Sequence, residues 1–241
     1  LPDLDNPKSF NEKIIWLALN YKNPDIRIGA DKYRAKEYIS SKVGSQYVVP
    51  LLGAYDDVAQ VDFDSLPEKF VAKANSGWGS DQVIIVTNKD TYCIDHLKVM
   101  MSTWLYRWCT YYYQNMCITD EKIEPKLVIE ELLETEEGGS VDDYKFYCCN
   151  GEPRFALVVS DRKARTQTRT FVDMNWECIP VMRKGKKTAA SPKKPKKLRE
   201  MVKLCRILSK DFPLVRIDFY EVDGRVYVGE LTFTPGMFLG F

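Results

Sequence analysis

Apolar residues recur at helical spacing in several parts of the chain. Ser9-Phe-Asn-Glu12 has the form of a capping box, and the apolar residues that follow it predict a helix beginning there. A second helix is expected from about Asp25 to Val43, where Gly44 ends it. Further helices are expected over residues 90–115, which are dense in aromatic side chains, and over Lys196–Ser209.

Other stretches alternate apolar and polar residues, or are short and apolar, as β-strands are. Strands are expected at Tyr47–Leu52, Lys69–Ala74, Gln82–Thr87, Lys126–Leu133, Asp143–Cys149, Arg154–Val159 and Thr168–Val172, and in a final hairpin over residues 214–236. Between the second and third of these lies Asn75-Ser-Gly-Trp-Gly-Ser-Asp81, which is too rich in glycine and polar residues for regular structure.

Composition narrows the classes of function. The chain has 241 residues, of which 45% are apolar and 29% are charged, so it can bury a core. Its net charge of +1 argues against nucleic acid and acidic membranes as partners. The apolar runs fall well short of the roughly 20 residues that a membrane span needs.

Histidine and cysteine usage argues against two enzyme classes. His96 is the only histidine, and no G-x-S-x-G or C-x-x-C motif is present, which disfavours zinc enzymes and serine hydrolases. The seven cysteines are expected to be small buried residues in a reducing cytoplasm. The chain begins with Leu1 rather than Met and shows no signal-peptide pattern, so we expect a cytoplasmic fragment.

The final hairpin is the most informative segment, because its register decides which side chains meet. Two alternating strands flank Asp223-Gly224. One expected face is apolar and holds Val215, Ile217, Phe219, Tyr227, Leu231 and Phe233, and the other holds Arg216, Asp218, Tyr220, Glu230 and Thr232. A two-residue loop would separate Asp218 and Glu230 onto opposite faces, whereas a three-residue loop pairs them directly. Only the longer loop keeps the apolar set together, so it is the predicted one.

Two directly opposed carboxylates repel each other. At about 4 Å and an effective dielectric near 20, the repulsion amounts to roughly 4 kcal/mol. Arg216 lies on the same face but is offset by one pair, so it is expected to relieve only part of this repulsion. A divalent cation such as Mg²⁺, which prefers carboxylate and phosphate oxygens, is therefore the expected neutralising partner.

The order of motifs resembles the ATP-grasp ligases. Arg216-x-Asp218 followed by Glu230-x-Thr232-x-x-Pro-Gly resembles their metal-binding end. Asp31-Lys32, Phe70-Val-Ala-Lys73 with the loop 75–81, Leu127–Leu133 and Asp143 stand where those enzymes place their nucleotide-binding residues.

Within that superfamily, the chain is similar to the TupA-like ATP-grasp family. The resemblance is carried by Asn6–Trp16, Asp142-Asp-Tyr-Lys-Phe146, Ser160-Asp-Arg162 and Gly229-Glu-Leu-Thr-Phe-Thr-Pro235. It implies an α+β ATP-grasp fold with a helical part (residues 1–46), a lid subdomain (47–127) and a C-terminal ATP- and Mg²⁺-binding subdomain (128–241).

The resemblance also implies an activity, which is ATP-dependent joining of a carboxylate to an amine through an acylphosphate. The implied acid is a uronic acid or an amino acid of a bacterial surface polysaccharide. The implied site residues are Lys32 and Lys73 for ATP phosphates; Ser76, Gly77, Gly79 and Ser80 in the lid loop; Glu130, Glu131, Leu132 and Leu133 for adenine; Asp143 for ribose; Asp218, Glu230 and Thr232 for Mg²⁺; Arg216 for the acylphosphate; and Arg162 and Arg169 for the substrate carboxylate.

Three features depart from the family pattern. Thr232 stands where most ATP-grasp enzymes have Asn, and Trp78 is bulky for a glycine-rich lid. The chain ends five residues after Gly236, sooner than the resemblance implies, so a further C-terminal piece is expected.

Other interpretations remain open from the sequence. Residues 183–199 hold nine Lys and Arg and no acid, which favours a solvated, mobile loop over a patch for an anionic substrate. Asp62-Phe-Asp64 has the D-x-D form found in nucleotide-sugar glycosyltransferases, although Val61–Pro67 is expected to be a turn into a short helix. A degenerate ATP-grasp module that only binds a partner is the third possibility.

Overall fold

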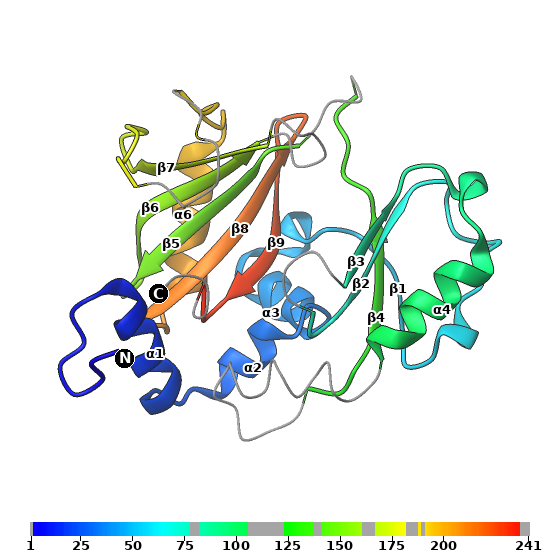
Figure 1. Cartoon of the computed structure of the whole chain (residues 1–241). Coiled ribbons are helices and arrows are strands. Elements are labelled where there is room, and N and C mark those ends of the chain that lie inside the picture. Colours follow the sequence, from blue (N-terminus) through cyan, green and yellow to red (C-terminus); the bar gives the residue numbers. More distant parts are fainter. Residues whose placement is uncertain are drawn as a thin grey trace. The chain divides into compact units, whose positions relative to one another are not determined.

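Two compact units make up the chain in its computed structural model (Figure 1). Unit 1 comprises Leu1–Glu37, Val49–Leu132 and Thr234–Phe241, and unit 2 comprises Tyr38–Val48 and Leu133–Phe233. The structure describes residues 2–77, 82–105, 123–136, 141–160, 167–181, 188 and 191–236. The expected segments 1–46, 47–127 and 128–241 do not coincide with these units, and they stay a prediction about subdomains.

The N-terminal helix begins as the sequence predicts. Helix α1 spans Phe10–Asn20. The Glu12 N–H donates to Ser9 Oγ (3.2 Å), and the Ser9 N–H donates to Glu12 Oε2 (2.8 Å), so the capping box is confirmed.

The single helix expected over Asp25–Val43 is wrong, because the chain breaks at Asp31. Helix α2 spans Pro24–Ala30 and helix α3 spans Arg34–Val43. The buried Asp31 carboxylate accepts the N–H groups of Tyr33 (2.9 Å) and Arg34 (3.3 Å), which is how Asp competes with a continuing helix. The break leaves Lys32 outside both helices, where its N–H donates to the Asn75 carbonyl (3.0 Å).

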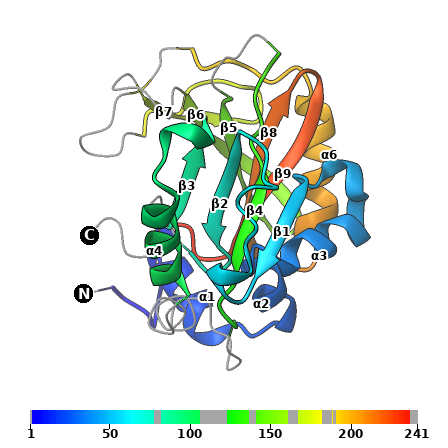
Figure 2. The same ribbon diagram turned by 90° about the vertical axis from the view of Figure 1, so that its right-hand side faces the viewer.

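Unit 1 contains a four-stranded antiparallel sheet in the order β1-β4-β2-β3. Its strands are β1 (Leu51–Tyr55), β2 (Phe70–Ala74), β3 (Val83–Val86) and β4 (Leu127–Glu131). Helix α4 (Ile94–Trp104) lies along one face (Figure 2) and buries Leu97, Met101 and Trp104 against the alternate residues Phe70, Ala72, Leu127 and Ile129. The opposite face therefore carries Lys73 and Glu130.

Several element boundaries in this region differ from expectation. The strand expected at Tyr47–Leu52 begins only at Leu51, and the helix expected from residue 90 begins at Ile94. Three short 3₁₀ turns, η1 (Ser45–Tyr47), η2 (Val58–Gln60) and η3 (Lys89–Thr91), account for neighbouring residues. The remainder of the expected aromatic helix, residues 106–115, lies outside the described residues.

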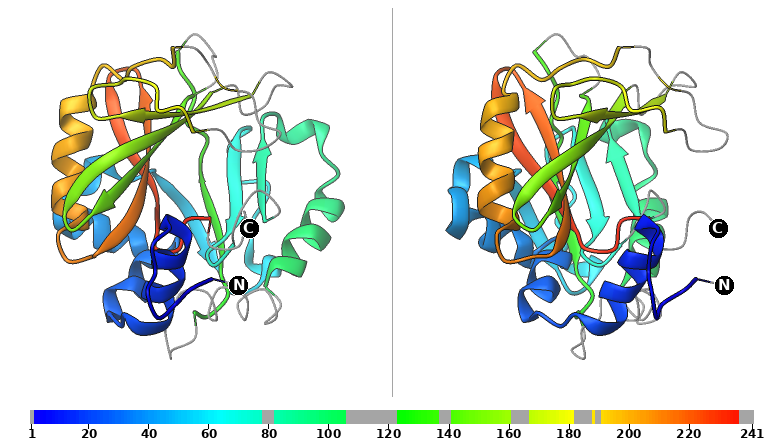
Figure 3. Two further views of the ribbon diagram at one scale, coloured as in Figure 1. Left: turned by 60° about the vertical axis from the view of Figure 1, so that its left-hand side comes forward. Right: turned by 90° about the vertical axis from the view of Figure 1, so that its left-hand side faces the viewer.

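Unit 2 contains a five-stranded antiparallel sheet in the order β7-β6-β5-β8-β9. Its strands are β5 (Asp143–Cys149), β6 (Glu152–Ser160), β7 (Thr168–Asp173), β8 (Leu214–Val222) and β9 (Arg225–Thr232). Helix α6 (Leu198–Ser209), gold in Figure 3, covers the face that holds the buried side chains of Phe146, Ile217 and Phe219. The opposite face carries Asp143 and Lys145 of β5, Arg216 and Asp218 of β8, and Glu230 of β9.

The β8–β9 hairpin pairs Asp218 with Glu230, as predicted, but through a different turn. Asp223 and Gly224 form a two-residue turn with φ of 47° and 77°, and Val222 pairs with Arg225. The register then shifts, since Phe219 pairs with Val228 while Asp218 pairs with Glu230. Gly229 is the extra residue of this β-bulge. The expected three-residue loop is therefore wrong, and Val228 rather than Tyr227 joins Phe219 on the apolar face.

The cysteines differ in how far they are exposed. Cys148 and Cys205 are buried, but Cys93 and Cys178 are exposed, so the expectation of uniformly buried cysteines is wrong. The five described cysteines are free. No helix in the described part of the chain is long and apolar enough to cross a membrane.

Gly229 lies in the bulge at a position where any larger residue would clash with a neighbouring side chain. A Cβ at this position would lie 2.5 Å from Cε2 of Tyr220, closer than carbon atoms can approach. We expect Gly229→Ala to lower the free energy of unfolding by about 1–3 kcal/mol, measured by urea denaturation. In a Tyr220→Ala background the same substitution should cost less, since the clashing ring is gone. An equal cost in both backgrounds would contradict this account of the bulge.

Candidate functional site

The break at Asp31 brings Lys32 to the start of the predicted lid loop. The Lys32 ammonium donates to the Gly77 carbonyl, and Asn75 is held by the Lys126 N–H (2.8 Å) and the Glu124 carbonyl (2.9 Å). Ser76 is buried, and its Oγ has no hydrogen-bond partner among the described residues. The structure thus brings Lys32, Ser76 and Gly77 together, while Gly79 and Ser80, like Trp78, lie outside the described residues.

On the sheet of unit 1, Glu130 is shared by two lysines. Lys73 Nζ lies 2.6 Å from Glu130 Oε2, and Lys36 Nζ lies 2.6 Å from Glu130 Oε1. Burial by itself raises the pKa of Glu130, but the two ammonium groups outweigh it and hold this pKa below its usual range. Burial also lowers the pKa of Lys36; Glu130 opposes this shift and Lys73 adds to it.

Lys36 is a site residue that the sequence reasoning missed. Its position four residues after Lys32 was a visible signal, but a continuous helix would have given no reason to connect it to Glu130. The register of β2 against β4 explains only the contact with Lys73, which lies diagonally across from Glu130. Lys36 reaches the same carboxylate from α3, through a tertiary contact.

The rest of the predicted adenine segment follows β4. Glu131 is exposed, its N–H donates to the Pro50 carbonyl (3.1 Å), and Leu132 and Leu133 are half-buried. The Glu130 side chain is engaged with Lys36 and Lys73, so the residues that follow it are the better candidates for a contact with adenine.

On the sheet of unit 2, Asp218 is likewise shared by two cations. Arg216 binds it with two bonds, from Nε to Oδ1 (2.6 Å) and from Nη2 to Oδ2 (2.8 Å), and Lys145 Nζ also pairs with Oδ2. Lys145 pairs in addition with Asp143 Oδ2 (2.8 Å), and Arg216 Nη2 lies 3.6 Å from Glu230 Oε2. The register explains the cluster, because Asp218 faces Lys145 on one side and Glu230 on the other.

Arg216 and Lys145 determine how readily Asp218 ionises. Burial raises the pKa of Asp218, but Arg216 and Lys145 outweigh it and lower this pKa to about 2. Burial likewise works against the charge of Arg216, yet Asp218 and Glu230 raise its pKa. Arg216 relieves part of the repulsion, as predicted, but a metal ion is not the only other group that neutralises the pair. The chain supplies Lys145 as a second cation, which hairpin parity could not reveal.

The donor set still fits a magnesium ion in its chemistry. Asp218 and Glu230 offer carboxylate oxygens, and Thr232 Oγ1 is buried without a hydrogen-bond partner in the described part of the chain. Asp143, Asp218 and Glu230 against Arg216 and Lys145 give three negative and two positive charges, so the cluster has a formal charge of −1. No group of three or more His, Cys, Asp or Glu side chains suited to a metal occurs among the described residues.

Of the remaining predicted site residues, the structure describes Asp143 and Arg169. Asp143 is fully buried and paired with Lys145, so its carboxylate already has a partner within the sheet. Arg169 on β7 pairs with Val159, which pairs with Asp143, so Arg169 lies on the same face. Its Nε donates to Gln167 Oε1 (3.3 Å). Arg162 lies outside the described residues.

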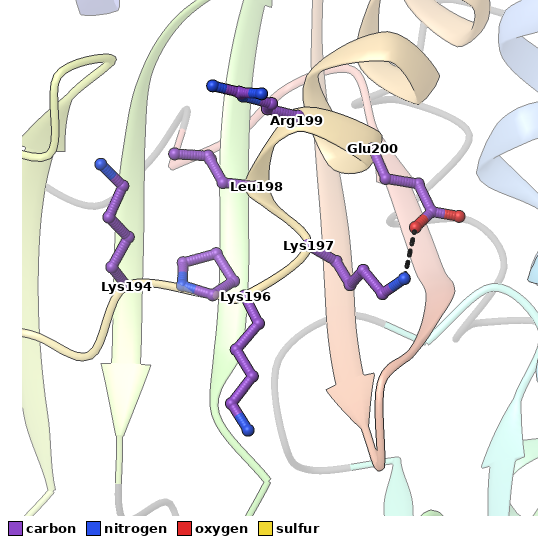
Figure 4. A pocket seen from close by; sticks show the side chains of 7 residues that line it. Lys194, Lys196, Lys197, Leu198, Arg199 and Glu200 are labelled. Atoms are coloured by element: carbon purple, nitrogen blue, oxygen red, sulfur yellow. Dashed lines mark ion pairs between the residues drawn. The ribbon is translucent and has the colours of Figure 1, made fainter.

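The described part of the basic stretch, residues 191–199, is attached to unit 2. Pro192 and Pro195 are buried, and Trp176 Nε1 donates to the Pro192 carbonyl (3.1 Å). Lys194, Lys196, Lys197 and Arg199 line a hollow of about 540 Å³ (Figure 4). Lys197 pairs there with Glu200 at 3.7 Å. The Lys and Arg side chains of this part are exposed, as predicted for a solvated loop, and its mobility stays a prediction. Most of residues 182–190 lie outside the described part.

The chain matches one protein family over most of its length. The model of a family described as TupA-like ATPgrasp matches residues 12–240. Among solved structures, D-alanine–D-alanine ligase from Bacillus anthracis is 21% identical, with a TM-score of 0.52, over 87% of this chain and 58% of that one. The ATP-grasp ligase PsnB with its minimal precursor is 16% identical, with a TM-score of 0.50, over 96% of this chain and 61% of that one.

These likenesses establish the ATP-grasp fold. The chain spans about three fifths of the length of these two ligases. The Bacillus anthracis ligase is also known in complex with ATP, and that structure is 18% identical, with a TM-score of 0.51, over 87% of this chain and 55% of that one. Comparison with curated protein sequences gave no match.

The Asp218 cluster predicts a specific pH dependence. Because the pKa falls from 3.8 to about 2 on folding, the ionised carboxylate stabilises the fold above pH 4, and this stabilisation disappears as the pH falls toward 2. We expect Asp218→Asn to lower the free energy of unfolding by about 2 kcal/mol at pH 7, with the difference from wild type vanishing near pH 2. Urea denaturation over this pH range measures it. Asp211→Asn, at an exposed ion pair with Lys42, should change little, and a pH-independent difference for Asp218→Asn would contradict the assignment.

Proposed function

We propose that this chain, which belongs to the TupA-like ATP-grasp family, is an ATP- and Mg²⁺-dependent ligase that joins a carboxylate to an amine. The observation that carries the proposal is the pair of charged clusters, each on the sheet face opposite the covering helix. The one around Glu130 has surplus positive charge, and the one around Asp218 has surplus negative charge. These are the charges that a nucleotide phosphate and a metal ion require.

In this proposal the nucleotide is held mainly by unit 1 residues. Lys32 and Lys73 bind phosphate oxygens, and the buried Ser76 Oγ with the backbone of Gly77, Gly79 and Ser80 adds donors. The backbone of Glu131, Leu132 and Leu133 reads the adenine edge, while the Glu130 side chain pairs with Lys73. Asp143 is the candidate for ribose, and its pairing with Lys145 would then have to loosen.

The oxygen atoms of Asp218, Glu230 and Thr232 are the proposed ligands of Mg²⁺. When bound, this ion withdraws charge from the ATP phosphates. Arg216 is held by two bonds to Asp218, so its guanidinium is oriented before substrate arrives. That orientation lets it stabilise negative charge on a transferred phosphoryl group at little reorganisation cost.

The proposed reaction has two steps. A carboxylate oxygen attacks the γ-phosphorus of ATP, the bond from this phosphorus to the β,γ-bridging oxygen breaks, and an acylphosphate and ADP form. An amine then attacks the acyl carbon, phosphate leaves, and the amine loses a proton to give the amide. The protein acts by positioning and by charge neutralisation, with Arg216 at the acylphosphate and Arg162 and Arg169 at the substrate carboxylate.

The substrate class rests on the family resemblance. We propose a uronic acid or amino-acid carboxylate of a bacterial surface polysaccharide, and a cytoplasmic site of action. The D-x-D alternative gains no support, because the Asp62 carboxylate caps a turn by accepting the N–H groups of Asp64 (3.2 Å) and Ser65 (3.4 Å). A module without catalysis would have no need for the retained Asp218–Glu230 pair.

Substitution of Glu230 tests the metal-dependent chemistry. ADP release should be stimulated when a uronic acid or amino acid is supplied with a suitable amine, and a panel of such pairs identifies the substrates. Glu230→Gln should lower this stimulated rate by about 100-fold or more while leaving the melting temperature close to wild type, since Glu230 is the partly exposed member of its cluster.

A second carboxylate of the same sheet serves as the control. Glu152 pairs with Arg206 at the surface, so Glu152→Gln should keep full activity. A panel in which no carboxylate–amine pair stimulates ADP release from the wild-type protein would count against a ligase.

A further inference from the structure

Glu130 lies at the centre of a buried trio in unit 1. Its two oxygens each lie 2.6 Å from one ammonium nitrogen, Oε1 from Lys36 and Oε2 from Lys73. The exposed fractions of the three side chains are 6% for Glu130, 13% for Lys36 and 11% for Lys73. Lys36 Nζ also donates to the Val49 carbonyl (2.7 Å), so this ammonium group is engaged with two protein oxygens.

The trio has a surplus of charge. Two ammonium groups and one carboxylate sum to +1, and the charges that act on Glu130 are those of Lys36 and Lys73. An uncompensated positive charge at a buried site is energetically unfavourable, so the trio favours binding of an anion. Without Lys36, Glu130 would neutralise Lys73 completely, and the surplus would disappear.

We propose that Lys36 sets the charge of the nucleotide site. By occupying one oxygen of Glu130, it leaves Lys73 with positive charge available to an ATP phosphate. Lys36 is then a positioning residue, because it acts through Glu130 and does not itself contact the nucleotide. This inference rests on the proposed function, in which Lys73 binds an ATP phosphate.

A purely structural role for Lys36 makes different predictions. In that case its bond to Val49 and its ion pair would only hold the start of α3 in place, and further loss of Glu130 could not restore binding. If charge is what matters, affinity should follow the summed charge of the trio rather than the number of native contacts retained.

Three variants separate these roles. The trio has a charge of +1 in the wild-type protein, 0 in Lys36→Met, +2 in Glu130→Gln, and +1 again in the Lys36→Met/Glu130→Gln double variant. ADP binding, measured by titration calorimetry with Mg²⁺ present, should weaken by about tenfold in Lys36→Met. It should return to within about threefold of wild type in the double variant and be no weaker than wild type in Glu130→Gln.

Two control variants and a measurement of folding separate the effect of charge from an effect of lost structure. Lys36→Arg keeps the charge and should bind ADP nearly as wild type does. Lys42→Met removes a lysine from the same helix, α3, whose partner Asp211 is at the surface, and should leave ADP affinity unchanged. Thermal melting reports on folding, and if Lys36→Met does not fold, Glu130→Gln alone still decides, because only the charge role predicts undiminished affinity.

The outcomes that overturn the inference are specific. Wild-type affinity in Lys36→Met, or a double variant as weak as Lys36→Met, would show that Lys36 does not act through the charge of Glu130. Failure of the wild-type protein itself to bind ADP would overturn the proposed function and the inference with it.

Discussion

A buried carboxylate shared by two cations stands on one face of each sheet, opposite the helix that covers the other face. In unit 1 the carboxylate is Glu130, between Lys36 and Lys73, and in unit 2 it is Asp218, between Arg216 and Lys145. Burial alone would raise the pKa of both acids, and the paired cations reverse that effect. A buried ion pair of this kind holds only while its geometry is kept. The strand registers, with the β-bulge at Gly229 that brings Asp218 opposite Glu230, provide that geometry.

The two clusters differ in the sign of the charge that is left over. The Glu130 trio sums to +1, whereas Asp143, Asp218 and Glu230 exceed Arg216 and Lys145 by one negative charge. Before any ligand binds, the Glu130 trio therefore favours binding of an anion, and the Asp218 cluster favours binding of a cation. An enzyme that transfers a phosphoryl group from a metal-bound nucleotide needs both, and catalysis by charge placement works best when the charges are oriented in advance.

Sequence reasoning reached the α+β class, most strands and the Asp218–Glu230 pair, because alternation and capping are local signals. It reached that pair by assuming a longer turn, whereas the chain uses a tight Asp223-Gly224 turn and recovers the register with a bulge. It missed Lys36 and Lys145, since each meets its carboxylate partner only through tertiary pairing: Lys145 across the β5–β8 register, and Lys36 from α3. It extended one helix through Asp31, where side-chain capping outweighs helix periodicity.

The central claim is that the chain activates a carboxylate as an acylphosphate, and trapping that intermediate tests it most directly. Wild-type protein would be incubated with ATP, Mg²⁺, a panel of uronic acids and amino acids, and hydroxylamine in place of the natural amine. The account predicts a hydroxamate formed in a one-to-one ratio with ADP for at least one acid, and none with Glu230→Gln. ATP hydrolysis that yields no hydroxamate with any acid would contradict it.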